Sequence, residues 1–165
     1  MKELWQLINM LFSSKPGDFD TPKLLPMKHY PFKGYRFIMW CGRMIYRAEN
    51  KENIDRYMQT YAGKESLTHE TIHLRQAQVT GSWVKYYWRY FVEWIKGNPI
   101  CHPASSAYYT IKYEMEAYAN ENNPNYPANY TGNNLSRYKI KGGRKKLYKS
   151  VGGTSKAWKT YIRTL

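Results

Sequence analysis

The segment from Ser66 to Thr80 constrains the fold more than any other part of the sequence. It contains no Gly or Pro before Gly81, and Ser66 is a residue type that caps helices, so we expect a helix here. Within this segment His69 and His73 stand four residues apart. A helix places residues at this spacing on one face, about one turn apart. Any fold of the chain must therefore accommodate two neighbouring imidazole rings on one side of this helix.

The residues from His69 to His73 read His-Glu-Thr-Ile-His, which is the pattern of a helical zinc site. Two imidazole nitrogens at this spacing can bind one tetrahedral Zn2+ ion. In sites of the H-E-x-x-H type the glutamate takes a proton from the water at the metal and passes it to the leaving amine. We therefore predict one zinc ion, with His69 and His73 as ligands and Glu70 as the catalytic base.

A third ligand is needed, because a catalytic zinc ion commonly has three protein ligands and keeps its fourth position for water. Glu114 and Glu116 compete for this role on a later predicted helix. Residues two apart on a helix point about 200° away from each other, so both cannot face the metal well. We favour Glu114 and keep Glu116 as the alternative. The carboxylate that is not a ligand would then be a solvated charge or a capping partner.

Together, His69 to His73 and the later run Glu114-Met115-Glu116-Ala117-Tyr118 resemble the gluzincin branch of the zincin metallopeptidases. The pair is similar in particular to small bacterial minigluzincin-like domains of unassigned substrate. The resemblance covers residues 67–122 and implies a zincin-like core in which a glutamate on a later helix completes a His, His, Glu site. It is specific for a metal site and says nothing of the substrate.

The chain departs from the gluzincin pattern at one position. In many gluzincins the third ligand begins an E-x-x-A-D pattern, whose Asp supports a ligand histidine. Glu114 and Ala117 match this pattern, but Tyr118 stands where the Asp would be. In the alternative register, which begins at Glu116, Asn120 takes that place and could accept a hydrogen bond from a ligand imidazole.

The rest of the sequence predicts one mainly helical α+β domain over residues 1–165. Aromatic and branched residues around a Cys41-Gly42 break indicate a small hairpin or sheet before the metal-binding helix. A mostly apolar helix after it is expected to be buried, and Gly-rich and Asn-rich composition indicates an irregular, basic tail from about residue 125. The expected elements are a connector over 15–31, strands over 35–40 and 43–47, and helices over 54–61 (ending near Gly63), 66–80, 82–95 and from Ser105 or Ser106 to 119.

Charge and composition narrow the range of partners. The net charge of +14, from 26 Lys and Arg against 12 acids, favours anionic partners such as an acidic substrate or a nucleic acid. The apolar stretch from Trp83 to Ile95 contains charged residues and is shorter than the roughly 20 residues of a membrane span. Two cysteines, Cys41 and Cys101, indicate buried free thiols rather than a disulfide framework, and His102 is expected to be an ordinary loop residue. With no recognisable signal peptide, we expect a cytoplasmic protein.

Three functions follow as hypotheses. The first is a zinc-dependent hydrolase, a metallopeptidase acting on peptides or proteins, with acidic substrates favoured by the charge. The second is a nucleic-acid-binding protein that uses the tail. The third is a domain that zinc stabilises without turnover. The second rests on basic residues interleaved with Tyr138 and Tyr148, namely Lys139, Lys141, Arg144, Lys145, Lys146 and Lys149.

Overall fold

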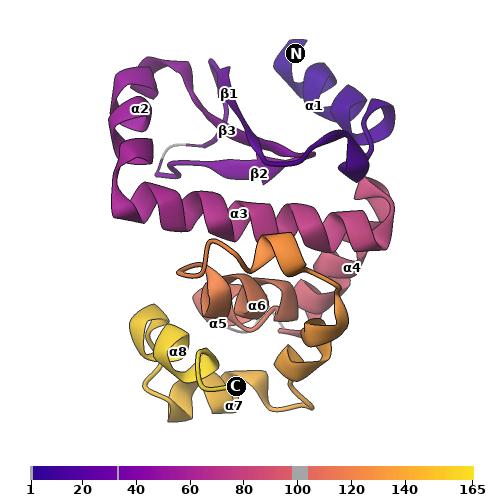
Figure 1. The fold of residues 1–165 in the computed structure, drawn as a ribbon. Coiled ribbons are helices and arrows are strands. Elements are labelled where there is room, and N and C mark those ends of the chain that lie inside the picture. Colours follow the sequence, from indigo (N-terminus) through magenta and orange to yellow (C-terminus); the bar gives the residue numbers. More distant parts are fainter. Residues whose placement is uncertain (1, 33, 98–103) are drawn as a thin grey trace.

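The computed structural model describes residues 2–32, 34–97 and 104–165. The longest described helix, α3 (Tyr61–Thr80), crosses the middle of the molecule (Figure 1). A small sheet with α1 (Lys2–Ser13) and α2 (Lys51–Gln59) lies on one side of α3, and most of the second half of the chain lies on the other. The fold is α+β and mainly helical, which confirms the predicted class.

The sheet has three strands in the order β1-β3-β2. The predicted hairpin is confirmed, because β2 (Ile38–Trp40) and β3 (Arg43–Arg47) pair antiparallel around Cys41-Gly42. The segment predicted as a connector contributes β1 (Lys23–Met27), which pairs parallel with β3. Pro26 is tolerated there because β1 is an edge strand and needs no second partner. Two 3₁₀ helices, η1 (Pro16–Asp18) and η2 (Ala48–Asn50), flank the sheet in the chain.

The helix that carries His69 and His73 begins earlier than the sequence predicted. Thr60, rather than Ser66, caps α3, and its hydroxyl accepts a hydrogen bond from the Gly63 amide at 3.1 Å. Gly63 does not end a helix but lies in the first turn of α3. A Cβ atom at this position would lie 2.1 Å from the carbonyl oxygen of Tyr57, so a glycine lets α3 start directly against the end of α2.

The third predicted helix is divided into two. α5 (Ala104–Tyr109) and α6 (Lys112–Asn120) are separated at Ile111, whose backbone is extended with φ −66° and ψ 124°. The Ile111 side chain is fully buried, so the break directs an apolar group into the core. A new helix start here places Glu114 in the first turn of α6.

The helix α4 (Trp83–Lys96) is less buried than its apolar composition predicted. Trp83, Tyr86 and Glu93 are buried on one side, whereas several large apolar side chains on α4 remain exposed. The prediction of a buried helix was therefore wrong for one face, which is formed by Val84, Trp88, Phe91 and Ile95. None of the described helices is both long and apolar enough to cross a bilayer.

The region after residue 125, predicted to be irregular, contains further helices and builds a second core. It includes the 3₁₀ helices η3 (Pro127–Asn129) and η4 (Asn133–Tyr138) and the helices α7 (Arg144–Ser150) and α8 (Ser155–Ile162). Trp158 of α8 is fully buried, and its indole N–H donates to the carbonyl of Tyr109 at 2.7 Å. This second core packs on α6 and consists of Met115, Tyr138, Tyr148, Trp158 and Ile162.

Of the two cysteines, Cys41 is a buried free thiol, as predicted, and burial raises its pKa to about 12. Cys101 and His102 lie outside the described residues.

A buried ion pair joins α7 to α4. The guanidinium of Arg144 contacts the carboxylate of Glu93 and also donates to the Glu93 carbonyl at 2.9 Å. Lys96 contacts the other carboxylate oxygen at 2.7 Å. Although burial alone would raise the pKa of Glu93, its contacts with Lys96 and Arg144 lower it. The ion pair therefore favours the charged form of Glu93 and joins α7 to α4.

We expect Arg144→Ala to lower the free energy of unfolding by about 2–3 kcal/mol, because a buried carboxylate loses its better partner. In the wild type this stabilisation is present above the ordinary Glu pKa of about 4.3 and is lost as the pH falls through the lower pKa of the folded state. Urea denaturation at several pH values measures both effects. Lys146→Ala, on the exposed side of α7, is the control and should change the free energy of unfolding by less than about 0.5 kcal/mol. Equal losses for the two variants would contradict the assignment.

Candidate metal centre

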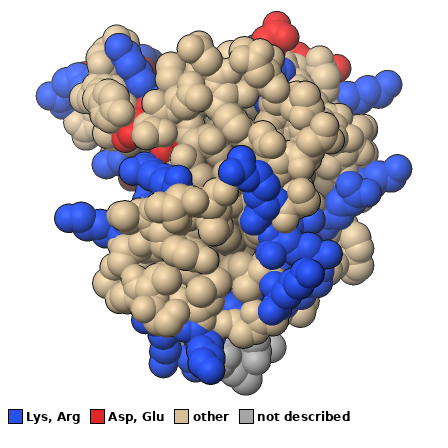
Figure 2. Space-filling view, turned by 60° about the horizontal axis from the view of Figure 1, so that its bottom comes forward, with Lys and Arg blue, Asp and Glu red and all other residues tan. Residues whose placement is uncertain are grey.

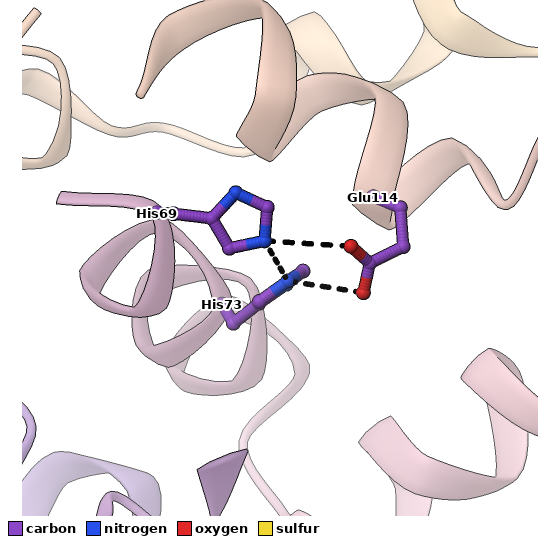
Figure 3. Close-up of side chains that lie close together, drawn as sticks. All are labelled: His69, His73 and Glu114. Atoms are coloured by element: carbon purple, nitrogen blue, oxygen red, sulfur yellow. Dashed lines mark hydrogen bonds and ion pairs between the residues drawn. The ribbon is translucent and has the colours of Figure 1, made fainter. Parts of the chain in front are cut away.

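Three predicted ligands meet where α3 packs against α6. His69 and His73 project from one face of α3, and Glu114 faces them from the first turn of α6 (Figure 3). All three side chains are buried. Two helices that are far apart in the sequence thus bring two imidazoles and one carboxylate to a single point, as the sequence predicted.

The distances between the donor atoms fit one tetrahedral metal ion. The Nε2 atoms of His69 and His73 lie 3.1 Å apart. The carboxylate oxygens of Glu114 lie 3.2 Å from the Nε2 of His73 and 3.4 Å from the Nε2 of His69. Around a tetrahedral zinc ion with bonds of about 2.0–2.1 Å, neighbouring donors are about 3.3 Å apart. The three groups are therefore already spaced as zinc ligands.

The pairing of the Glu114 carboxylate gives a second indication of fit. Its Oε1 accepts a hydrogen bond from the hydroxyl of Tyr90 at 2.7 Å. Its Oε2 is fully buried and has no hydrogen-bond partner among the described residues. A buried carboxylate oxygen without a partner carries a large desolvation cost, and a cation bound there would remove it. The donor set of two imidazoles and one carboxylate is that of many catalytic zinc sites.

The outer nitrogen of His69 is held by an acid that the sequence analysis missed. Its Nδ1 lies 3.2 Å from a carboxylate oxygen of Glu121, just after α6. Donation from Nδ1–H to this carboxylate leaves Nε2 with the lone pair that binds a metal. The other Glu121 oxygen lies 3.2 Å from Lys159 and 3.3 Å from Arg163, both on or beside α8. Glu121 stands seven residues after Glu114, about two helical turns, and this spacing was the available signal.

Neither Tyr118 nor Asn120, the two positions considered for a group that supports a ligand histidine, forms a hydrogen bond with His69 or His73 among the described contacts. Tyr118 packs its ring against His69 with the ring centroids 4.3 Å apart, so it shapes the site by contact. The side-chain amide of Asn120 donates to the Glu116 carbonyl at 2.8 Å and to the Tyr138 hydroxyl at 3.1 Å. The amide of Asn120 thus forms its hydrogen bonds within α6 and to a residue of the second core, Tyr138.

His73 is held by two groups that were also missed. Its Nδ1 lies 2.8 Å from the amide oxygen of Gln76 and 3.1 Å from the hydroxyl of Tyr86. The amide nitrogen of Gln76 donates to Glu116 at 2.9 Å and to the Tyr113 carbonyl at 3.0 Å, which fixes the amide orientation. Because Gln76 presents its oxygen to His73, the Nδ1 atom carries the proton and Nε2 is left for a metal. Gln76 lies three residues after His73, on the same helix face.

Glu116, the alternative ligand, lies outside the ligand cluster. It is fully buried, so the expectation of a solvated charge for the second glutamate was wrong. Its carboxylate accepts hydrogen bonds from Gln76, from the Tyr126 hydroxyl and from the Tyr130 hydroxyl, each at 2.9 Å. Glu116 therefore anchors the loop after α6 and orients Gln76.

Electrostatics within the cluster hold it together without a metal. Burial disfavours the charged form of His69, but contacts with Glu114 and Glu121 raise its pKa to about 10. Burial likewise opposes ionisation of Glu114, yet His73 and His69 hold its pKa well below the usual range. The imidazoles favour the charged form of Glu114, and Glu114 favours the charged form of the imidazoles.

Glu70 follows His69 directly on α3. It is half-buried, whereas the three ligand side chains are buried. Burial raises the pKa of its carboxyl group, and the neighbouring His69 and His73 oppose this shift. The carboxyl group of Glu70 is therefore influenced by the charge of both imidazole rings, and it is partly exposed to solvent.

Comparisons with known proteins give no relative. No known family matches the chain, and neither the curated proteins nor the solved structures contain a match. The resemblance to gluzincins therefore rests on two short segments, His69 to His73 and Glu114 to Tyr118.

Removing the outer support of the histidines should weaken metal binding without removing a ligand. We expect Gln76→Ala and Glu121→Gln each to raise the Kd for Zn2+ about 10- to 100-fold, the usual effect of such partners. Competition with a chromophoric chelator measures the Kd.

Gln78→Ala is the matched control for Gln76→Ala. Gln78 lies on the same helix, but its amide donates to the carbonyls of Pro16 and Phe19, away from the ligands. Its loss should leave the Kd for Zn2+ unchanged. If both glutamine variants bound zinc as the wild type does, Gln76 would have no role at the metal.

Proposed function

We propose that this chain is a zinc-dependent hydrolase, and more specifically a metallopeptidase in which Glu70 activates water. The observation that carries the proposal is the convergence of the two Nε2 atoms and the Glu114 carboxylate at zinc-ligand spacing. Glu70 stands next to the first ligand, as the chemistry of H-E-x-x-H sites requires. One Zn2+ ion would be held by His69, His73 and Glu114.

When bound, zinc would supply a Lewis acid that polarises a carbonyl group and acidifies water. The residues of the chain would perform the proton transfers and hold the geometry. Glu70 would accept a proton from the attacking water and deliver it to the leaving amine as the C–N bond breaks. Glu121 and Gln76 would keep the proton of each ring on Nδ1, so that the unprotonated Nε2 of each ring faces the metal position. The net charge of +14 favours peptides with acidic residues.

The structure has the basic surface that the nucleic-acid hypothesis requires, but the two tyrosines expected to stack on bases are buried. Lys and Arg side chains are spread over the face in Figure 2, with few acidic atoms among them. However, Tyr138 and Tyr148 are buried in the second core, so they are not available to stack on bases. Arg144 is buried against Glu93. This function would therefore depend on charge alone, carried by Lys139, Lys141, Lys146 and Lys149, which are exposed, and by the half-buried Lys145.

Replacing Glu70 separates catalysis from metal binding. We expect Glu70→Gln to retain about one equivalent of zinc and to lose peptide cleavage by about 10²- to 10⁴-fold, because the amide cannot accept the proton. Metal content and cleavage of a mixed fluorogenic peptide library are the measurements. Glu65→Gln, on the same helix, is the control and should cleave as the wild type does.

Two other results would count against a peptidase. A wild-type protein that holds zinc but cleaves no peptide in the library would support a zinc-stabilised domain without turnover. A wild-type protein that takes up no zinc would refute the metal site itself.

A second experiment distinguishes the roles of Glu114 and Glu116, the two glutamates of α6. We expect Glu114→Gln to lose most of its bound zinc, whereas Glu116→Gln keeps zinc and loses about 1–3 kcal/mol of stability. The reason is that Glu116 accepts hydrogen bonds from two tyrosines and Gln76 instead of facing Nε2. Metal analysis combined with thermal unfolding distinguishes the two. Loss of zinc in Glu116→Gln with zinc retained in Glu114→Gln would reverse the ligand assignment.

A further inference from the structure

A pocket of about 480 Å³ lies beside the metal centre. Its walls come from the end of α3, the second half of α4, the start of α6 and the loop around Gly132. Trp88 and Arg89 belong to the lining and are exposed, so the pocket opens to solvent. Gln76, whose amide oxygen holds His73, also lines it, so the pocket and the metal centre share a wall. The volume lies in the range of about 300–1,000 Å³ that is usual for small-molecule sites.

Positive charge exceeds negative charge around this pocket. Arg89, Lys96 and Lys112 line it, against a single acid, Glu93. Glu93 is already bound through both carboxylate oxygens, one to Lys96 and the other to Arg144. Its charge is therefore committed, and the cations that line the pocket are in excess.

Lys112 is the most constrained of these cations. It is half-buried at the start of α6, with its ammonium 5.1 Å from the ring centre of Tyr113. An anion placed among Arg89, Lys96 and Lys112 would relieve the repulsion between these cations.

We propose that the pocket binds a phosphate-bearing small molecule, with its phosphate between Arg89, Lys96 and Lys112. Phosphate carries compact multiple charge, and the planar guanidinium of arginine matches two of its oxygens at once. The apolar part of the lining, Val79, Val92 and Trp88, provides a surface for a ring or chain attached to the phosphate. The volume of the pocket fits a small ligand. This inference does not depend on the hydrolase proposal.

Isothermal titration of the full chain with pyrophosphate and with ADP tests the site. Arg89→Gln removes an exposed cation and should not disturb folding, and Arg89→Gln/Lys112→Gln removes two of the three. We expect each phosphate probe to bind the wild type, and the double variant to bind at least about tenfold more weakly, since each lost charge-assisted contact is worth about that factor. Binding should be the same for zinc-loaded and zinc-free protein.

The control variant Lys146→Gln/Lys149→Gln removes the same charge from exposed positions of α7. It should bind both probes as the wild type does. Equal weakening in the control would mean that the net charge alone attracts phosphate, which overturns the proposal. Absence of binding to the wild type would overturn it as well. So would an oligonucleotide that binds through Arg89 and Lys112 while pyrophosphate and ADP do not.

Discussion

Two imidazole rings and a carboxylate are taken out of water together where α3 packs on α6. Burying three such groups is unfavourable unless each of them forms hydrogen bonds or ion pairs. Neighbouring polar side chains provide most of these partners. Glu121 and Gln76 hold the outer nitrogens of the rings, and Tyr90 holds one oxygen of Glu114. The inner atoms are left facing one another, and Oε2 of Glu114 has no hydrogen-bond partner in the described part of the chain. A metal cation would satisfy all of these inner atoms at once.

The C-terminal region provides partners for the acidic residues that support the two histidines. Glu121 is neutralised by Lys159 and Arg163, and Glu116, which orients Gln76, is held by Tyr126 and Tyr130. The segment that looks like a basic tail in the sequence therefore supplies cations and hydroxyls to the carboxylates behind the histidines. Its own core, built around Trp158, packs on the opposite side of α6. The basic charge of the chain is partly used inside the molecule, since Arg144 is also buried against Glu93.

Helical periodicity is local, so the sequence was sufficient to predict that His69 and His73 share a face of one helix. It also favoured Glu114 over Glu116 as the glutamate near them, and the structure places Glu114 beside both rings. Glu121 and Gln76 were missed because the ring that each would contact depends on how α3 and α6 are packed, which no local pattern encodes. The class of fold and the β2-β3 hairpin were also predictable from residue types. The break at Ile111 was not, because it depends on a buried site for that side chain. The helices α7 and α8 were hidden by the glycines between them, which end short helices but do not prevent them.

The support of His69 spans great distances along the chain. The histidine contacts a glutamate 52 residues later, and that glutamate contacts a lysine a further 38 residues on. Contacts of such high sequence separation are slow to form, because the entropy of closing the intervening loops is lost first. The helix α3, with the contact between His73 and Gln76, can form early from local interactions. The contact of His69 with Glu121, by contrast, joins distant parts of the chain. The full set of contacts around His69 is therefore complete only when α8 has packed on α6.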